Sequence, residues 1–168
     1  MPTKTPKTIA MLAVLALAAV TACSEADTPA SPLQPERNAD QVSIDQGVWG
    51  DVWFWQGDFM PGTPTGTVTP VAREIVIHEL TAQADVTMDR DDPRFIAEIG
   101  TPEVARATSG ADGFFQVALP PGRYSVFAVE GGGFYANGSD GAGNIQPVTV
   151  VSGEVAGVLV NIDYLSTW

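Results

Sequence analysis

The residues that could perform acid–base or nucleophilic chemistry are few in this sequence. His78 is the single histidine, and on an extended strand it lies on the face opposite Ile75 and Ile77. A serine triad would need a histidine beside a serine in a Gly-x-Ser-x-Gly turn, and the sequence contains no such turn. We therefore expect His78 to be an exposed or groove-side strand residue, and we expect a non-enzymatic protein.

Two loops carry oxygen-rich side chains of the kind that bind calcium. They are Asp89–Asp92 and Asn137–Asn144, the second of which contains Asp140 and several glycines. Calcium takes six to eight oxygen ligands, and neither loop has the fixed offsets of an EF-hand. Because Asn, Asp and Gly are also the usual turn formers, we expect solvated loops, with calcium binding as the alternative. No cofactor or metal is predicted.

Paired carboxylates acting as acid and base, as in glycosidases, are the enzymatic alternative. Such a pair needs two carboxyl groups about 5–10 Å apart in a cleft. A small domain with no cleft-building insertion makes this alternative the weaker one.

The densest aromatic cluster lies between residues 49 and 55. On a strand, Trp49, Trp53 and Trp55 share the face opposite Val48, Val52 and Phe54. Each tryptophan carries roughly 150–250 Å² of surface, so an exposed row would match the largest apolar patch of an ordinary soluble monomer. Something must therefore cover this face.

Two kinds of cover are open. The first is intramolecular, from Phe59, Phe134, Tyr135 or Trp168. The second is a ligand, because flat aromatic rings stack on sugars and also cap protein partners. The candidate ligand face then consists of Trp49, Trp53, Trp55, Phe134 and Tyr135.

The first 22 residues have the pattern of a cleavable secretory signal. Lys4 and Lys7 precede an apolar run of about 12 residues, which is too short to span a bilayer because spanning takes roughly 20. The run ends in Val20-Thr21-Ala22-Cys23, which resembles the lipobox of bacterial lipoproteins. We therefore expect Cys23, the only cysteine, to carry the lipid; the alternative is an ordinary signal peptide with a chance cysteine.

Residues 23–46 are predicted to be the lipidated cysteine and a flexible tether. Pro, Ser, Ala and acidic residues dominate this stretch, which cannot bury enough surface to offset the entropy of ordering. Several acyl chains on one N-terminus give near-permanent membrane attachment. Ser24 follows the cysteine where an aspartate commonly retains lipoproteins at the inner membrane, which favours the outer membrane of the cell envelope.

Residues 47–168 are predicted to form one all-β domain of about seven strands. Short β-branched and aromatic runs alternate with Gly, Pro and Asp-Gly turns. Asp85–Gly100 is expected to be an irregular excursion, and Gly110–Gly113 the turn of a hairpin. The expected strands are Val48–Trp55, Val71–Leu80, Val104–Ser109, Phe114–Leu119, Arg123–Glu130, Ile145–Val151 and Val158–Tyr164.

Alternation along these strands predicts the core of a β-sandwich. The inward-facing residues are expected to be Val48, Val52, Phe54, Ile75, Ile77, Phe115, Val117, Leu119, Tyr124, Val126, Val148, Val150, Val158, Val160 and Ile162.

The stretch from Thr108 to Val126 carries a family resemblance. It contains an Asp112-Gly113 turn, the run Phe115-x-Val117-x-Leu119 and a Pro121-Gly122 turn. This pattern resembles carboxypeptidase regulatory-like domains, which are prealbumin-type (transthyretin-like) β-sandwiches, and it is most similar to single-domain bacterial lipoproteins of that type. The resemblance implies an accessory or binding module. Metallocarboxypeptidase chemistry would need two histidines and a glutamate around zinc, and this chain has one histidine.

Charge excludes one class of partner. All 20 acidic residues follow the predicted leader, together with six arginines and no lysine, so nucleic acid is repelled. We expect a lipid-anchored envelope protein with a structural or binding role, whose partners are the membrane and a glycan or an envelope protein. A carbohydrate-binding module that uses the aromatic strand face is the alternative.

Overall fold

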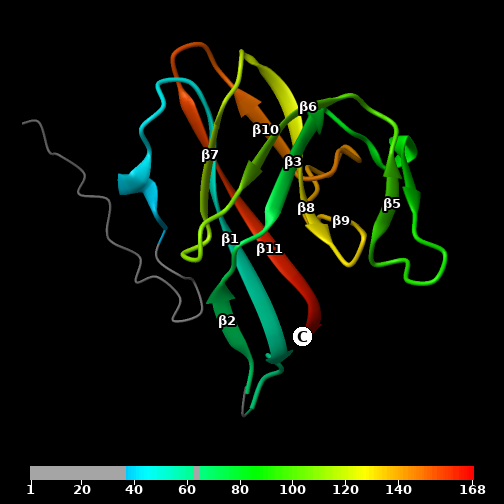
Figure 1. Ribbon diagram of the computed structural model, residues 1–168. Coiled ribbons are helices and arrows are strands. Elements are labelled where there is room, and N and C mark those ends of the chain that lie inside the picture. Colours follow the sequence, from blue (N-terminus) through cyan, green and yellow to red (C-terminus); the bar gives the residue numbers. More distant parts are fainter. Residues whose placement is uncertain (1–36, 63–64) are drawn as a thin grey trace, which may run out of the picture. The chain divides into compact units, whose positions relative to one another are not determined.

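Strands from distant parts of the sequence are arranged in two sheets (Figure 1). The computed structural model describes residues 37–62 and 65–168, where the non-strand elements are two 3-10 turns, η1 (Ala39–Gln41) and η2 (Gln83–Asp85). No helix in this described part is long and apolar enough to cross a membrane. Cys23 and the predicted leader lie outside the described residues.

The first sheet is built on β1 (Gly47–Asp58), the strand that carries three tryptophans. β11 (Val155–Thr167) runs parallel to β1 along one edge. On the other edge, β7 (Phe114–Ala118) pairs antiparallel with the first half of β1, and β2 (Thr67–Pro70) pairs with the second half. β1 is therefore the central strand of this sheet.

The second sheet is antiparallel and has the order β4-β5-β9-β8-β3-β6, with β10 also paired to β8. Its strands are β3 (Glu74–Glu79), β4 (Val86–Met88), β5 (Ile96–Ile99), β6 (Glu103–Thr108), β8 (Gly122–Glu130), β9 (Gly133–Tyr135) and β10 (Pro147–Val150).

The predicted turn at Gly110–Gly113 is present, but it is not the turn of a hairpin. The N–H of Gly113 donates to the carbonyl of Gly110 at 2.9 Å, and Gly113 has a φ of 83°. A Cβ on Gly113 would lie 2.6 Å from the carbonyl oxygen of Val52. The prediction of a hairpin was wrong because β7 pairs with β1, so the turn carries the chain from the second sheet to the first.

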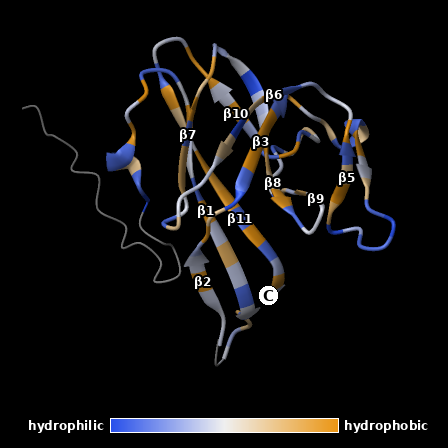
Figure 2. Cartoon of the chain, in the orientation of Figure 1, coloured by the Kyte–Doolittle hydropathy of each residue, from blue (hydrophilic) through white to orange (hydrophobic). Residues whose placement is uncertain are grey.

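The main core lies between the two sheets and confirms the prediction of an all-β sandwich. All fifteen residues predicted from alternation belong to this core, thirteen of them buried. The other two, Phe54 and Val117, are partly buried and pack against it. Figure 2 shows the corresponding apolar colour along β1, β3 and β11. Alternation was sufficient here because each strand has one face turned to the opposite sheet.

A second core covers the outer face of the second sheet. Val76 and Phe127 are fully buried there, and Ile96 and Ile145 are nearly so. The cover is the arm, defined as residues 86–99, which contains β4, β5 and their turn. These two strands join the rest of the second sheet through one residue pair, Ile96 with Phe134, and their apolar side chains pack on Val76 and Phe127. The expectation that Asp85–Gly100 is irregular was wrong. β4 and β5 are only three and four residues long, too short to show a clear period of two.

Residues 37–46, here called the strap, lie against the first sheet. Asp51 of β1 is fully buried and accepts hydrogen bonds from Arg37 Nε at 3.2 Å and Asn38 Nδ2 at 2.7 Å. Arg37 Nη2 also donates to the carbonyl of Val158 at 2.7 Å. The folded part therefore begins at least at Arg37, ten residues before the predicted boundary at Gly47, because the buried carboxylate of Asp51 takes its donors from the strap.

Candidate functional site

The predicted ligand face on β1 is largely covered. Trp53 and Trp55 are only 9% and 8% exposed, and Trp49 is partly buried. The ring centroids of Phe59 and Trp168 lie 5.3 Å and 5.5 Å from that of Trp55. Phe59 and Trp168 also stack on each other, with centroids 4.9 Å apart. Two of the four expected intramolecular covers thus lie on this face.

Trp49 is covered by other groups. The guanidinium carbon of Arg37 lies 4.4 Å from the centroid of the Trp49 ring, a cation–π arrangement. The ring of Phe114 lies at a centroid distance of 6.4 Å. One arginine therefore both pairs with the buried Asp51 and covers the tryptophan beside it.

Phe134 and Tyr135 are not part of the tryptophan face. Both lie on β9 of the second sheet, where Phe134 packs against the second core and Tyr135 is buried in the main core. The ring of Tyr135 lies 5.4 Å from that of Tyr164 and 5.9 Å from that of Phe95, between centroids. The five residues of the predicted ligand face are thus divided between the two sheets.

His78 lies on the outer face of β3, as expected, but it is 6% exposed rather than accessible. Its Nδ1 lies 2.8 Å from the carbonyl oxygen of Thr101, so Nδ1 is the protonated nitrogen. Nε2 has no hydrogen-bond partner among the described residues, and the ring makes edge contacts with Phe127 and Phe134. These contacts make His78 a side chain of the second core.

The acidic loops use their carboxylates to hold their own backbones. Asp89 Oδ1 accepts from the N–H groups of Asp91 and Asp92 at 2.8 and 2.9 Å. Asp140 accepts from Asn144 Nδ2 at 2.6 Å, a hydrogen bond that lowers the pKa of Asp140. No group of three or more His, Cys, Asp or Glu side chains with metal-binding geometry occurs within residues 37–62 and 65–168.

A groove of about 370 Å³ opens between the arm and the loop that joins β9 to β10. The aliphatic side chains that line it are Val86, Met88, Ile96, Ala136 and Ile145. Ile96 and Ile145 also belong to the second core, so this core forms part of the groove wall. Its volume lies within the usual range of small-ligand sites, roughly 300–1,000 Å³.

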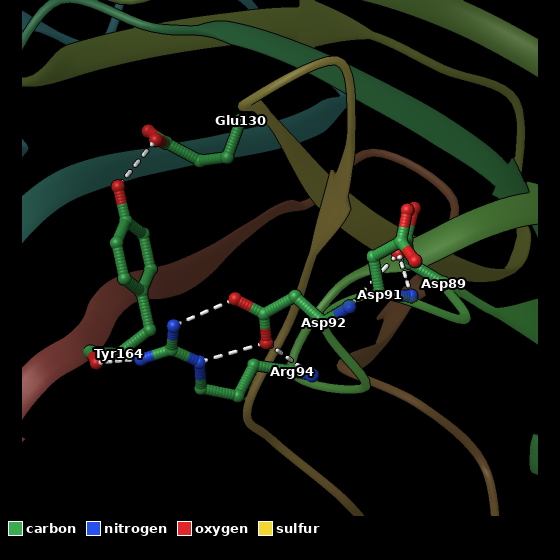
Figure 3. Close-up of polar contacts among 6 residues, drawn as sticks. All are labelled: Asp89, Asp91, Asp92, Arg94, Glu130 and Tyr164. Carbon is green, nitrogen blue, oxygen red and sulfur yellow. Dashed lines mark hydrogen bonds and ion pairs between the residues drawn. The ribbon is translucent and has the colours of Figure 1, made fainter.

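Arg94 supplies the one charged side chain among the lining residues, and its position is fixed (Figure 3). Nε and Nη2 donate to the two carboxylate oxygens of Asp92 at 2.8 and 2.6 Å, and Nη1 donates to the carbonyl of Tyr164 at 2.8 Å. The hydrogen bonds to Arg94 lower the pKa of Asp92, and the same contact raises the pKa of Arg94. Three of the five guanidinium N–H groups are used in these contacts.

Gln146 fixes the opposite wall of the groove. Its φ of 38° is positive, which is uncommon for a residue other than glycine. The Gln146 N–H donates to the carbonyl of Gly138, and Nε2 donates to the carbonyl of Leu159, both at 2.8 Å. The wall is also held to the segment before the arm, because the N–H of Gln83 donates to the carbonyl of Gly143 at 2.9 Å. The groove is therefore largely pre-formed.

A network of tyrosines and acids lies behind Arg94. Tyr164 Oη donates to Glu130 at 2.9 Å, and Glu130 forms an ion pair with Arg73 (Figure 3 shows the tyrosine contact). Tyr135 donates to Asp163. The pKa of both tyrosines is raised, mainly because burial disfavours the charged phenolate and also because each hydroxyl donates to an acidic side chain. The two carboxylates are thus engaged in hydrogen bonds that join the two sheets.

The sequence contained a partial signal for the groove. The spacing of Asp92 and Arg94, two residues apart, suggests a local ion pair. Ile96, two residues further along, is the first apolar residue of β5. Nothing local indicated that this segment folds back against residues 134–145, because that contact depends on one β5–β9 residue pair and on apolar packing.

No protein-family model, curated protein or solved structure matches this chain.

Proposed function

We propose that this protein is a non-enzymatic, lipid-anchored protein of the cell envelope that binds a partner in the groove between the arm and the β9–β10 loop. The groove carries the proposal, because an apolar floor with a few fixed polar groups is the usual composition of a binding site. The carboxypeptidase regulatory-like resemblance agrees with this proposal, since such domains are accessory or binding modules. The leader and Cys23 supply the anchor.

Binding fits the site better than catalysis does. Arg94 is paired with Asp92, and the nearby Glu130 and Asp163 are hydrogen-bonded to tyrosines. A general acid or base must reach a substrate proton, and these carboxylates are engaged with other side chains. The groove therefore supports recognition without a chemical step.

The aromatic strand face gives the alternative, a carbohydrate-binding module. Burial of Trp53 and Trp55 argues against it, because sugar stacking needs an accessible ring face. Its remaining support is Trp168, which is 61% exposed and stacked on Phe59.

Anchoring is tested by labelling the full chain with an alkyne fatty acid in a Gram-negative host. We expect Cys23→Ser to abolish labelling and membrane retention, whereas the neighbouring Ser24→Ala keeps both. Equal labelling of Cys23→Ser and the unaltered chain would contradict the lipid anchor.

Binding in the groove is tested with isoleucine methyl NMR on the chain lacking the leader. A library of fragments of mixed charge is added, and the methyl signals of Ile96 and Ile145 are compared with those of Ile75 and Ile162 in the main core. We expect some fragments to shift the methyl signals of Ile96 and Ile145 while the signals of Ile75 and Ile162 stay unchanged. A library that moves neither groove methyl, or that moves all four alike, would refute the groove as the binding site.

A further inference from the structure

The groove also indicates the chemistry of its ligand, an inference that rests on the proposed function. We propose that the groove binds an uncharged aliphatic acyl group, an ester or amide, whose carbonyl oxygen accepts a hydrogen bond from Arg94. The chemical class of the ligand follows from three features of the groove: the pairing of Arg94 with Asp92, the aliphatic floor and the hydrogen-bond donors at the rim.

The charge of Arg94 is balanced locally. Asp92 binds the guanidinium through two hydrogen bonds of 2.8 and 2.6 Å, so an anionic ligand would meet a neutral pair rather than a free cation. The chain as a whole carries a formal charge of −12, which further disfavours anions. A cationic ligand would find no counter-charge in the groove, because none of the described lining residues is acidic. An uncharged ligand avoids both penalties.

The floor selects an aliphatic body over a sugar. Val86, Ile96 and Ile145 contribute branched aliphatic side chains, and Met88, 43% exposed, adds a flexible thioether at the opening. None of the described residues lining the groove is aromatic, whereas sugar rings are usually held by stacking on aromatic faces. Alkyl groups gain roughly 0.8 kcal/mol per buried methylene without needing such a platform.

The rim supplies donors for a carbonyl oxygen. Arg94 uses three of its five N–H groups in the contacts to Asp92 and Tyr164, which leaves two for a ligand acceptor. Gln83 and Asn137 add carboxamide groups that can donate to an ester and can also accept from an amide N–H. An acyl group, apolar at one end and carrying a carbonyl at the other, matches this arrangement.

The test compares six-carbon probes that differ only in their polar group. N-methylhexanamide, hexanoate, hexylammonium and hexanol are titrated into the chain lacking the leader, together with methyl glucoside, and binding is measured from the Ile96 and Ile145 methyl signals. We expect the amide to bind at least about tenfold more tightly than either charged probe, and hexanol, which has no carbonyl, to bind more weakly than the amide.

Arginine variants identify the donor. Arg94→Gln should weaken amide binding at least about tenfold, the value of one hydrogen bond to a charged donor. Arg106→Gln is the matched control, since Arg106 forms the same two-bond contact with a carboxylate, Glu103, but on β6. It should leave amide binding unchanged. If Arg94→Gln disturbs the arm, Ser139→Phe provides a second test, because a ring at this exposed rim position should block the groove without removing a core contact.

Each other outcome overturns the inference in a recognisable way. Tighter binding of hexanoate would make the groove an anion site at Arg94, and a stronger response to methyl glucoside would make it a sugar site; both would leave the proposed binding function standing. If no probe shifts the groove methyls but other library fragments do, only the acyl chemistry is refuted. If neither probes nor library shift them, the binding function fails as well.

Discussion

The outer faces of the two sheets are both covered by a segment of chain, but the two covers are held differently. The strap is fixed to the first sheet by a buried carboxylate, Asp51, and by an arginine stacked on Trp49. The arm is held to the second sheet by apolar packing around Ile96 and a single β5–β9 residue pair. A charge network closes one face, whereas apolar packing leaves a groove beside the other. The tryptophan-rich face is therefore largely covered, and the less conspicuous face carries the candidate site.

The largest loss of stability is expected when the contact between the strap and the first sheet is broken. Arg37→Ala should lower the free energy of unfolding by about 3 kcal/mol, the low end for breaking a buried ion pair, because Arg37 is 39% exposed whereas Asp51 is fully buried and keeps only the Asn38 donors. Denaturant unfolding measures the loss. Adding Asp51→Asn to Arg37→Ala should recover part of it, since the unpaired charge is then removed.

The control for this comparison is Arg106→Ala. Arg106 also pairs with carboxylates, Glu74 and Glu103, but all three side chains are exposed, so its loss should cost at most about 1 kcal/mol. Equal costs for Arg37→Ala and Arg106→Ala would mean that the strap is not held through Asp51.

The second largest loss of stability is expected when the packing of the arm is weakened. Ile96→Ala should cost about 2 kcal/mol, the low end for truncating a buried isoleucine, because Ile96 lies beside the groove where the chain can relax. Met88→Ala on the same arm, largely exposed, should stay within about 0.5 kcal/mol. Hydrogen exchange should show faster opening of residues 86–99 in Ile96→Ala while β1 stays protected. Uniform loss of protection in both sheets would show that the arm and the sandwich unfold as one unit.

How far the sequence predicts this structure differs between the two covers. Alternation located the main core because every inward residue meets the opposite sheet. The same alternation placed His78 on an outer face but could not show that this face is covered by a second core, since two of the covering strands, β4 and β5, are too short to have a clear period. The strap was predicted to be flexible because polar, acidic and small residues dominate this stretch and its apolar residues are scattered. Its order comes instead from Asp51, and a lone aspartate inside an apolar strand was the available signal.

A smaller effect concerns the tyrosines between the two regions. The pKa values of Tyr135 and Tyr164 are raised in the folded state, so their neutral forms favour folding. This contribution is fully present below the ordinary tyrosine pKa, near 10, and is lost as the pH rises through the folded values. Denaturation midpoints should therefore fall above about pH 10. Tyr164→Phe should cost about 1 kcal/mol at pH 7 by removing the hydrogen bond to Glu130, and it should flatten the alkaline decline. An unaltered alkaline decline in the double variant Tyr135→Phe/Tyr164→Phe would refute this assignment.

The smallest effect is expected at the open end of the tryptophan face. Trp168 stacks on Phe59 but is 61% exposed, so Trp168→Ala should cost only about 0.5–1 kcal/mol, the value of an aromatic pair.

The decisive measurement is acrylamide quenching of tryptophan fluorescence. Trp168→Phe should remove most of the quenchable emission, because Trp53 and Trp55 are buried and Trp49 lies under Arg37. In Arg37→Ala, quenching of Trp49 should appear even where the fold is retained. Strong quenching that persists in Trp168→Phe would mean that at least one of Trp49, Trp53 and Trp55 is accessible, and it would restore the aromatic face as a competing ligand site.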